Sequence, residues 1–242
     1  MSTFDDGVAL VTGGSRGIGR AACVEFAARG MTVFTCARST DGLAETERLA
    51  EGAAGEVRGF EADVTAPEQM REIFDRIESE YGRLDLLVNN AGVLGPKAPI
   101  EEISLADWRR TMAVNLDGVF ICSKLAIGLL RESEAGFVLN VSSSVGRRGR
   151  GGWGPYAVSK HGVEGLTDTL ADELAEDGAC VVSVNPGGTA TEMRQKAYPD
   201  EDPSTIPTPE RVARTFAYLV EELTVDQTGG KFDSRELFEN LE

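Results

Sequence analysis

The sequence has few of the residues that build disulfide frameworks or metal sites. Its 242 residues include four cysteines, without a Cys-x-x-Cys pair, and a single histidine, His161. These are too few soft ligands for a zinc site, so the sequence predicts no metal centre. We expect the cysteines to be reduced and mostly buried, and His161 to lie at the surface. The cysteines are Cys23, Cys36, Cys122 and Cys180.

Long hydrophobic runs are also missing. Short apolar runs such as 8–11 fall far below the roughly 20 residues that span a bilayer. The first seven residues carry Asp5 and Asp6, and they lack the basic, apolar and small-residue regions of a secretory signal. The sequence therefore predicts a cytoplasmic protein with no membrane-spanning helix.

Basic residues are outnumbered, with 24 Lys and Arg against 40 Asp and Glu, which gives a net charge of −16. Such a charge repels nucleic acid phosphates and anionic lipids, so neither is an expected partner. The acidic composition resembles that of proteins from salt-loving microbes, which work where the Debye length is about 3 Å. An ordinary acidic enzyme from a high-GC genome has the same composition, and both interpretations stay open.

Short β-branched apolar runs alternate with longer amphipathic stretches along the whole chain. This alternation predicts an α/β fold, a doubly wound parallel seven-stranded sheet with helices on both faces (Rossmann-like), as a single domain over 1–242. Segment 187–209 holds four of the nine prolines and is too irregular to be one helix or strand, so we expect a substrate lid there. The expected strands are 8–12, 32–37, 56–62, 84–89, 136–141, 180–185 and 230–233.

A glycine-rich turn follows the first expected strand and precedes an amphipathic stretch at 20–28. It reads Thr12-Gly13-Gly14-Ser15-Arg16-Gly17-Ile18-Gly19. Gly13 and Gly17 can adopt backbone angles closed to other residues, and Gly19 lets the helix approach the sheet. Amides at the start of that helix are well placed to bind a pyrophosphate. The turn therefore predicts dinucleotide binding.

The end of the second expected strand indicates which dinucleotide is bound. A carboxylate there would accept hydrogen bonds from the adenosine ribose and favour NAD(H). This chain instead has Cys36-Ala37-Arg38, and Arg16 lies in the neighbouring glycine turn. Two guanidinium groups are suited to a 2′-phosphate, which favours NADP(H) over NAD(H). The alternative is that both arginines only coat the surface of an arginine-rich protein.

Tyr156 and Lys160 lie four residues apart in an expected helix, which places the phenol and the ammonium on one face. A free phenol has a pKa of about 10, which suits proton exchange at neutral pH poorly. We expect the Lys160 cation and an oxidised nicotinamide to lower the pKa of Tyr156. The pair then predicts general acid–base catalysis by Tyr156.

Taken together, these motifs resemble the short-chain dehydrogenase/reductase family over nearly the whole chain. The resemblance implies an NADP(H)-dependent oxidoreductase that interconverts a carbonyl and a secondary alcohol by hydride transfer, with a small-molecule substrate. It also implies a homodimer or homotetramer, for which the helix at 106–130 can supply a partner surface. The alternative is a non-catalytic NADP(H)-binding regulator on the same fold. The matching motifs are the glycine turn, Asp63-Val64, Asn89-Asn90-Ala91-Gly92, Asn115, Ser143, Tyr156-x-x-x-Lys160 and Pro186-Gly187.

The resemblance implies four catalytic residues, Asn115, Ser143, Tyr156 and Lys160. Ser143 would bind the substrate carbonyl, and it is chosen over its neighbouring serines because its distances to Gly146 and Tyr156 fit the family pattern. Lys160 would hold the nicotinamide ribose, and Asn115 would kink its helix and hold a water that links Lys160 to solvent. The implied cofactor-binding residues are Thr12, Gly13, Ser15, Arg16, Gly17, Ile18, Gly19, Arg38, Asp63, Val64, Asn89, Ala91, Gly92, Tyr156, Lys160, Pro186, Gly187, Thr189 and Thr191. Among them, Asp63 would contact the adenine and 89–92 would line the adenosine side.

Two further segments bear on the substrate. Arg147, Arg148, Arg150 and Trp153 lie between Ser143 and Tyr156 and so flank the predicted site; they either meet an acidic substrate or form a solvated loop. The sequence of the expected lid resembles that of oxidoreductases loosely grouped with oxoacyl-carrier-protein reductases. The segment 228–233, which contains the last expected strand, departs from the V-D-G-G-like ending typical of those reductases. The motifs therefore leave the substrate undefined.

Overall fold

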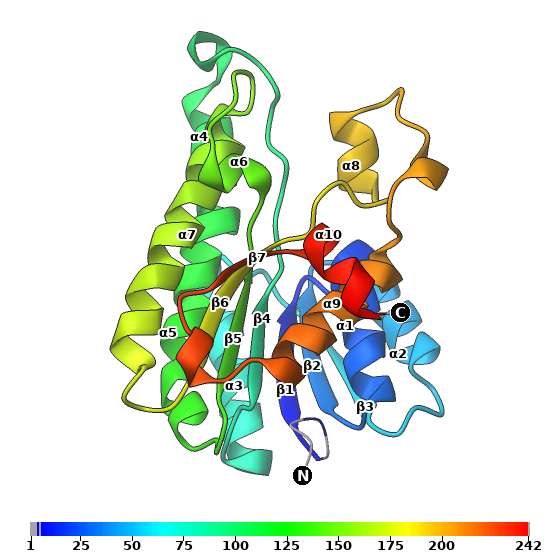
Figure 1. Cartoon of the computed structure of the whole chain (residues 1–242), viewed down its shortest axis with the longest axis vertical. Helices are drawn as coiled ribbons and strands as arrows, with labels where there is room; N and C mark the ends of the chain where they lie inside the picture. The colour runs from blue at the N-terminus through cyan, green and yellow to red at the C-terminus, as the bar shows by residue number, and fades with distance from the viewer. Residues whose placement is uncertain (1–3, 5, 242) are drawn as a thin grey trace.

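The computed structural model describes residues 4 and 6–241, so the ends of the predicted domain at 1–3 and 242 lie outside the described residues. Its centre is one parallel seven-stranded sheet in the order β3-β2-β1-β4-β5-β6-β7 (Figure 1). This confirms the predicted fold class. The strands are β1 (Val8–Thr12), β2 (Thr32–Ala37), β3 (Glu56–Glu61), β4 (Leu86–Asn89), β5 (Phe137–Val141), β6 (Cys180–Asn185) and β7 (Lys231–Asp233).

Helices cover both faces of the sheet, which explains why its central strands β1, β4, β5 and β6 are buried at every position. In β1, Ala9 and Val11 pack beneath α1 (Gly17–Ala28) and α9 (Pro209–Glu222), whereas Val8 and Leu10 face the opposite core. That second core is covered by α3 (Pro67–Tyr81), α5 (Gly118–Arg131) and α7 (Gly154–Leu174). α2 (Thr40–Leu49) packs beside β2 and β3. The four cysteines are free and buried, as the sequence predicts.

β4 begins at Leu86, two residues later than expected, because Asp85 replaces part of the strand ladder. The Asp85 carboxylate accepts a hydrogen bond from the Val8 amide at 2.8 Å. The same carboxylate accepts from the Ser133 hydroxyl at 2.6 Å and pairs with Arg83 at 3.1 Å. A buried carboxylate needs such partners, and the backbone of Asp85 also donates to the Val8 carbonyl oxygen and accepts from the Phe137 amide, both at 2.9 Å, so Asp85 anchors the amino-terminal edge of the sheet.

The chain reverses its winding direction between β1 and β4, which lie side by side although they are not consecutive. Loops that diverge from such a point leave a crevice at the carboxyl ends of the strands. The short helices α6 (Ser144–Arg147) and α8 (Glu192–Ala197) stand at this end, on opposite sides (Figure 1). The predicted lid therefore contains some regular structure, namely α8 and a 3₁₀ turn, Pro203–Thr205.

A continuous helical run joins α4 (Leu105–Met112), the π-helix Ala113–Asp117 and α5. This run, Leu105–Arg131, is long and apolar enough to pass a length-and-composition test for a membrane span, which the sequence analysis did not anticipate. Core helices pass the same test, and 44% of its most apolar window is buried inside the fold. Residues of α5 such as Ala126 and Leu130 belong to the core between the sheet and α3.

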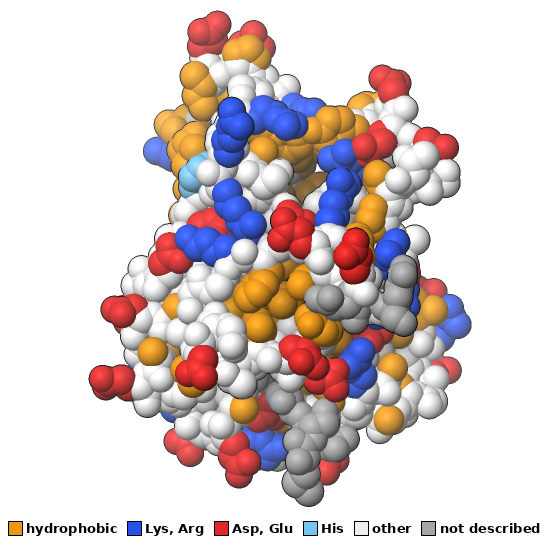
Figure 2. Space-filling model, viewed as in Figure 1, with side chains coloured by type: hydrophobic (Ala, Val, Ile, Leu, Met, Phe, Trp, Pro, Cys, Tyr) orange, Lys and Arg blue, Asp and Glu red, His pale blue; other side chains and the backbone are white. Residues whose placement is uncertain are grey.

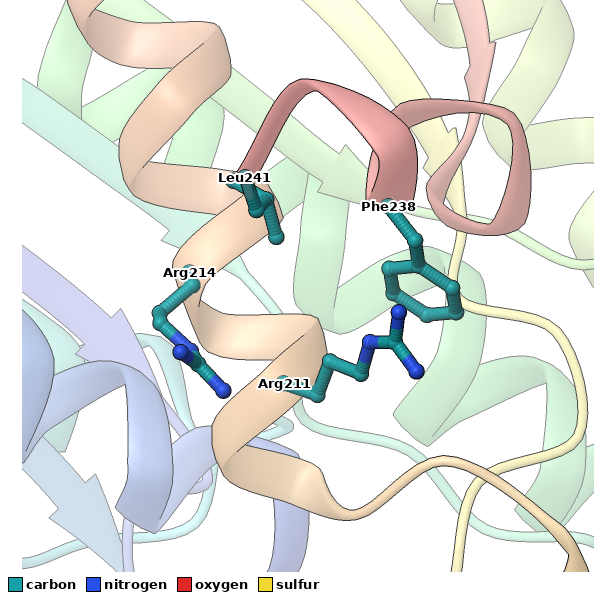
Figure 3. Close-up of a pocket in the computed structure, with 4 residues that line it drawn as sticks. All are labelled: Arg211, Arg214, Phe238 and Leu241. Atoms are coloured by element: carbon teal, nitrogen blue, oxygen red, sulfur yellow. The ribbon is translucent and has the colours of Figure 1, made fainter.

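The C-terminal segment forms α10 (Ser234–Leu237) and a 3₁₀ helix, Phe238–Leu241, after β7. Phe238 is buried against α9. Figure 3 shows the small pocket there, of about 260 Å³, between Arg211 and Arg214 of α9 and the side chains of Phe238 and Leu241. The Arg211 guanidinium lies 4.4 Å from the centre of the Phe238 ring. The unusual C-terminus is thus part of the packed fold.

Candidate active site

The glycine turn leaves no room for side chains at the end of β1. A Cβ at Gly13, where φ is +76°, would lie 2.9 Å from the Ala91 Cα, and one at Gly19 would lie 2.3 Å from the Gly13 carbonyl oxygen. α1 begins after Arg16 without a side-chain cap and without an acidic residue in its first turn. Its first amides are therefore available to an anion, and the close-packed cradle fits the pyrophosphate of a dinucleotide. Ser15 and Ile18 lie in the same turn.

Thr12 and Asn90 join the glycine turn to the end of β4. The Thr12 hydroxyl accepts hydrogen bonds from the Asn90 and Ala91 amides, both at 3.0 Å. The Asn90 side-chain amide donates to the Thr12 carbonyl oxygen at 2.9 Å. Asn90 was not among the predicted site residues, although its place in the 89–92 motif was a signal. The two strand ends that border the crevice are thereby held at a fixed separation.

Two predicted cofactor residues direct their side chains into the core. The Asn89 amide donates to Asn140 at 2.8 Å and to Ser123 at 3.1 Å, and the residue is 2% exposed. Val64 is buried and packs where a Cβ on Gly118 would stand. Only their backbones can face the crevice. Asn89 therefore links β4, β5 and α5, and its side chain does not line the adenosine side as the motif had suggested.

The two arginines predicted to bind a 2′-phosphate both extend toward solvent at the crevice and both have acidic partners. Arg16 pairs with Glu192, the first residue of α8, and Arg38 lies 4.0 Å from Asp63. The arginine side chains are 64% and 63% exposed. Partial burial acts to raise the pKa of Asp63, but hydrogen bonds from Thr65 and the charge of Arg38 lower it overall. Both guanidinium groups can exchange a carboxylate for a phosphate without leaving the surface.

Ser143, Tyr156 and Lys160 come together above the end of β5. The Ser143 side chain lies close enough to the Tyr156 phenol to act to lower its pKa, whereas Ser142 is buried beneath Gly146. The Lys160 ammonium is 4% exposed, donates to the Val141 carbonyl oxygen at 2.6 Å and lies 5.9 Å from the centre of the Tyr156 ring. The helix spacing thus places phenol and ammonium on one side of α7, as expected.

The charge states differ from expectation for Tyr156. Burial raises the pKa of Tyr156 above its ordinary value, and the hydrogen bond from Ser143 only partly offsets this. The expected lowering by Lys160 is wrong for the protein alone, because the ammonium is turned toward Val141 and its own burial lowers the pKa of Lys160 to about 8. A bound cation near the phenol is still required to lower the pKa of Tyr156.

Glu164 is a site-supporting residue that the sequence analysis missed. It lies one helical turn beyond Lys160, is 6% exposed, and its charge partly offsets the lowering of the Lys160 pKa. Its carboxylate accepts from the Ser183 hydroxyl at 2.8 Å and lies 3.5 Å from the Arg147 guanidinium. The repeated four-residue spacing from Tyr156 through Lys160 to Glu164 was the available signal.

Asn115 lies in the π-helix, which confirms the expected local distortion of its helix. Its side-chain oxygen accepts from the Val93 amide at 2.8 Å, and its amide donates to the Val93 carbonyl oxygen at 2.9 Å and to the Ser159 hydroxyl at 3.1 Å. Both hydrogens of the Asn115 side-chain amide are therefore donated to protein groups. Asn115 ties the loop after β4 to α7, the helix that carries Tyr156 and Lys160.

The segment after β6 closes the site and connects to the glycine turn. Gly187 has φ of +72°, and its amide donates to the Asn185 side chain at 3.0 Å. Thr189 is buried and hydrogen-bonds the Pro186 carbonyl oxygen. Thr191 caps α8, and its methyl group lies 3.3 Å from the position of a Cβ on Gly17. The base of the lid therefore contacts the glycine turn.

Arg147 does not line the mouth of the site as expected. Its guanidinium donates to the Phe232 carbonyl oxygen at 2.8 Å and pairs with Glu164, so it fixes α6 to β7 and α7. Arg148 and Arg150 remain at the mouth, where they line a pocket of about 480 Å³ with Ser144, Val145 and Gly149. Ser144, which lines this pocket, directly follows Ser143 in the chain.

An uncapped helix behind a glycine turn at the switch point, with a Ser–Tyr–Lys group beside it, defines a dinucleotide-dependent oxidoreductase. Comparison with known proteins agrees, because the family model for short chain dehydrogenases matches residues 7–202. The chain belongs to the short chain dehydrogenase family.

Several relatives cover almost the whole chain. It is 36% identical to the oxidoreductase YciK of Escherichia coli K12 over 96% of this chain and 93% of that one. It is also 36% identical to the 3-oxoacyl-[acyl-carrier-protein] reductase FabG of Thermotoga maritima, over 92% and 93%. Among solved structures, a short chain dehydrogenase of Shigella flexneri complexed with NADP superposes with a TM-score of 0.89 at 35% identity, covering 96% of this chain and 98% of that one. A short chain dehydrogenase of Escherichia coli CFT073, complexed with NADPH, gives 0.89 at 36% identity, covering 96% and 97%.

Proposed function

We propose that this protein is an NADP(H)-dependent oxidoreductase that interconverts a carbonyl and a secondary alcohol, with the chain working as one domain under the lid at 187–209. The observation that carries the proposal is the contact of Ser143 with Tyr156 beside the buried Lys160, next to a glycine turn built for a dinucleotide. A protein that only sensed the cofactor would have no use for this hydroxyl, phenol and ammonium in register.

NADP(H) is the proposed cofactor. The end of β2 offers Arg38 where NAD-binding relatives of this fold carry a carboxylate, and Arg16 lies in the glycine turn after the neighbouring strand β1. Two structural neighbours of high similarity are complexed with NADP or NADPH. The amides at the start of α1 would hold the pyrophosphate, and Arg16 and Arg38 would bind the 2′-phosphate. When bound, the nicotinamide supplies or accepts the hydride.

The residues of the chain then handle binding and the proton. Ser143 donates a hydrogen bond to the substrate oxygen and orients it toward the Tyr156 hydroxyl. Tyr156 gives its proton to that oxygen during reduction and takes it back during oxidation. Its raised pKa keeps the phenol protonated at neutral pH in the protein alone, which suits the acid role. To act on the nicotinamide ribose and on the Tyr156 phenol, the Lys160 ammonium must turn away from Val141. Asn115 holds α7, the helix that carries Lys160, in place.

Titration of the purified protein with NADPH and NADH, followed by turnover of a ketone panel, tests the proposal. We expect NADPH to bind much more tightly than NADH. Tyr156→Phe should bind NADPH within about twofold of wild type but lose turnover by on the order of 10² to 10⁴. Full activity of the Phe variant would refute the role of Tyr156, and absence of NADPH binding would refute the proposal as a whole.

The homodimer or homotetramer stays a prediction. Two large apolar side chains are exposed on the long helices, Phe120 on α5 at 51% and Val158 on α7 at 43%. Light scattering of the wild type and Phe120→Lys would test it. Assembly through these helices predicts a smaller particle for the variant, and an unchanged mass would exclude that surface.

A further inference from the structure

The mouth of the proposed active site carries positive charge that the protein itself does not neutralise. Among residues 4 and 6–241, many arginines form ion pairs with Asp or Glu. Near the mouth, Arg147 pairs with Glu164 and Arg194 pairs with Glu201. Lys97, Arg148 and Arg150 form none with the described residues, although the chain has a net charge of −16. Figure 2 shows Lys and Arg side chains gathered around the hollow at the end of the molecule where α6 and α8 stand.

Lys97 connects the mouth to the lid. Its ammonium donates to the Ala197 carbonyl oxygen at 2.6 Å and lies 4.8 Å from the centre of the Trp153 ring and 4.5 Å from that of Tyr198. It is therefore held between two aromatic faces, one from the loop before α7 and one from the lid. Aromatic faces attract a cation without cancelling its charge, so the ammonium remains able to bind an anion.

Arg150, in the loop before α7, also contacts Tyr198 of the lid. Its guanidinium donates to the Tyr198 hydroxyl at 3.2 Å. Arg148 and Arg150 also line the pocket of about 480 Å³ together with Ser144, the residue that follows Ser143 in the chain. A guanidinium group presents paired donors that match the two oxygens of a carboxylate or a phosphate. These cations lie at the substrate side, and they are separate from Arg16 and Arg38 at the adenosine end.

Aromatic rings form a path from the cations to the reacting group. The Trp153 ring centre lies 5.8 Å from that of Tyr156 and 6.0 Å from that of Tyr198. A molecule of one ring and a short chain is long enough to reach from Tyr156 to Lys97 along Trp153. Its flat body would pack on the indole, which supplies apolar contact without a charge preference.

We propose that the substrate is a small organic anion, a ketone or secondary alcohol with a ring-sized apolar body and a carboxylate or phosphate at its far end. The body lies on Trp153 with the carbonyl at Ser143 and Tyr156, and Arg150 and Lys97 bind the anionic group. This substrate class rests on the proposed carbonyl–alcohol function. It also gives the local cations a purpose, because the overall negative charge would otherwise repel such a molecule.

Binding to the protein saturated with NADP⁺ tests the substrate class directly. The probes are 4-acetylbenzoate, the uncharged 4-acetylbenzamide of nearly the same shape, and 4-acetylphenyl phosphate, with quenching of tryptophan fluorescence as the signal. We expect at least one anion to bind about tenfold or more tightly than the amide at low salt, and added salt to weaken only the anions. The tighter of the two anions identifies the group as carboxylate or phosphate.

Charge-removing variants locate the site. Arg150→Gln and Lys97→Gln should each weaken the tighter anion by about tenfold and leave the amide within about twofold. Arg110→Gln, an exposed arginine on α4, is the matched control and should change neither. Three outcomes would overturn the substrate class. They are equal affinity for the anions and the amide, no measurable binding of either anion, and a preference for the anion over the amide that survives when Arg150→Gln and Lys97→Gln are combined. Failure of NADPH to bind in the titration described above would instead overturn the proposed function.

Discussion

The buried ammonium of Lys160 should make the stability of this protein depend on pH in a specific way. Lys160 is 4% exposed, and burial lowers its pKa from 10.5 to about 8. Below pH 8 both the folded and the unfolded protein carry this charge, and the folded state bears its burial cost. Between pH 8 and 10.5 Lys160 binds more protons in the unfolded state, so its contribution to the free energy of unfolding rises with pH in that window.

The size of the effect follows from the same shift. One pKa unit corresponds to about 1.4 kcal/mol, so the burial of the charged lysine costs on the order of 3 kcal/mol at neutral pH. Lys160→Met removes that cost but also removes the hydrogen bond to the Val141 carbonyl oxygen, which is worth about 1 kcal/mol. We therefore expect the variant to be more stable than wild type by about 2 kcal/mol at pH 7.

Urea unfolding of the cofactor-free protein, followed by far-UV circular dichroism at one protein concentration, measures this difference between pH 7 and 9.5. The advantage of Lys160→Met should shrink above pH 8 by at most about 1.4 kcal/mol per pH unit. The upper limit avoids Tyr156, whose raised pKa makes folded protein less stable as pH rises above 10. Lys196→Met, at an exposed position of α8, is the control and should show no such trend. A stability difference that stays constant with pH would refute the reasoning.

Three more predictions concern residues that position the site. Asn115→Ala loses two hydrogen bonds to Val93 and one to Ser159, so it should lower the unfolding free energy by about 3 kcal/mol in urea titrations and also reduce turnover; an effect of only a few tenths of a kcal/mol would show that the bonds are not important. Glu192→Gln frees Arg16 of an exposed partner worth at most about 1 kcal/mol, so calorimetry should show NADPH binding up to about fivefold tighter, and weaker binding would contradict the assigned role of Arg16. Gly14→Ala would place a Cβ 2.0 Å from the Thr35 hydroxyl oxygen, so thermal unfolding should show a loss of about 1–3 kcal/mol, and wild-type stability would mean that the turn can shift.

Local patterns predicted the central strands because helices cover these strands on both faces. Continuous apolar runs such as Val8–Thr12 therefore correspond closely to the strands of the structure. Boundaries were less predictable where a side chain takes over from the backbone. Asp85 is the example, since its carboxylate, 77 positions from Val8 in the chain, accepts the hydrogen bond that ends the ladder. The π-helix at Asn115 is a similar case. The Asn115 side chain hydrogen-bonds Val93, in a loop 22 residues earlier in the chain.

The sequence by itself determined the parts of the site that depend on short spacing. The four-residue spacing of Tyr156 and Lys160 puts both on one face of α7, and the glycine spacing gave a turn into which Cβ atoms do not fit. Charges that meet across the fold were decided only by the tertiary structure. Arg147 turns to Glu164, Arg16 meets Glu192, and Lys97 reaches the lid 100 residues later, because contacts between distant segments depend on how the sheet and its loops bring them together.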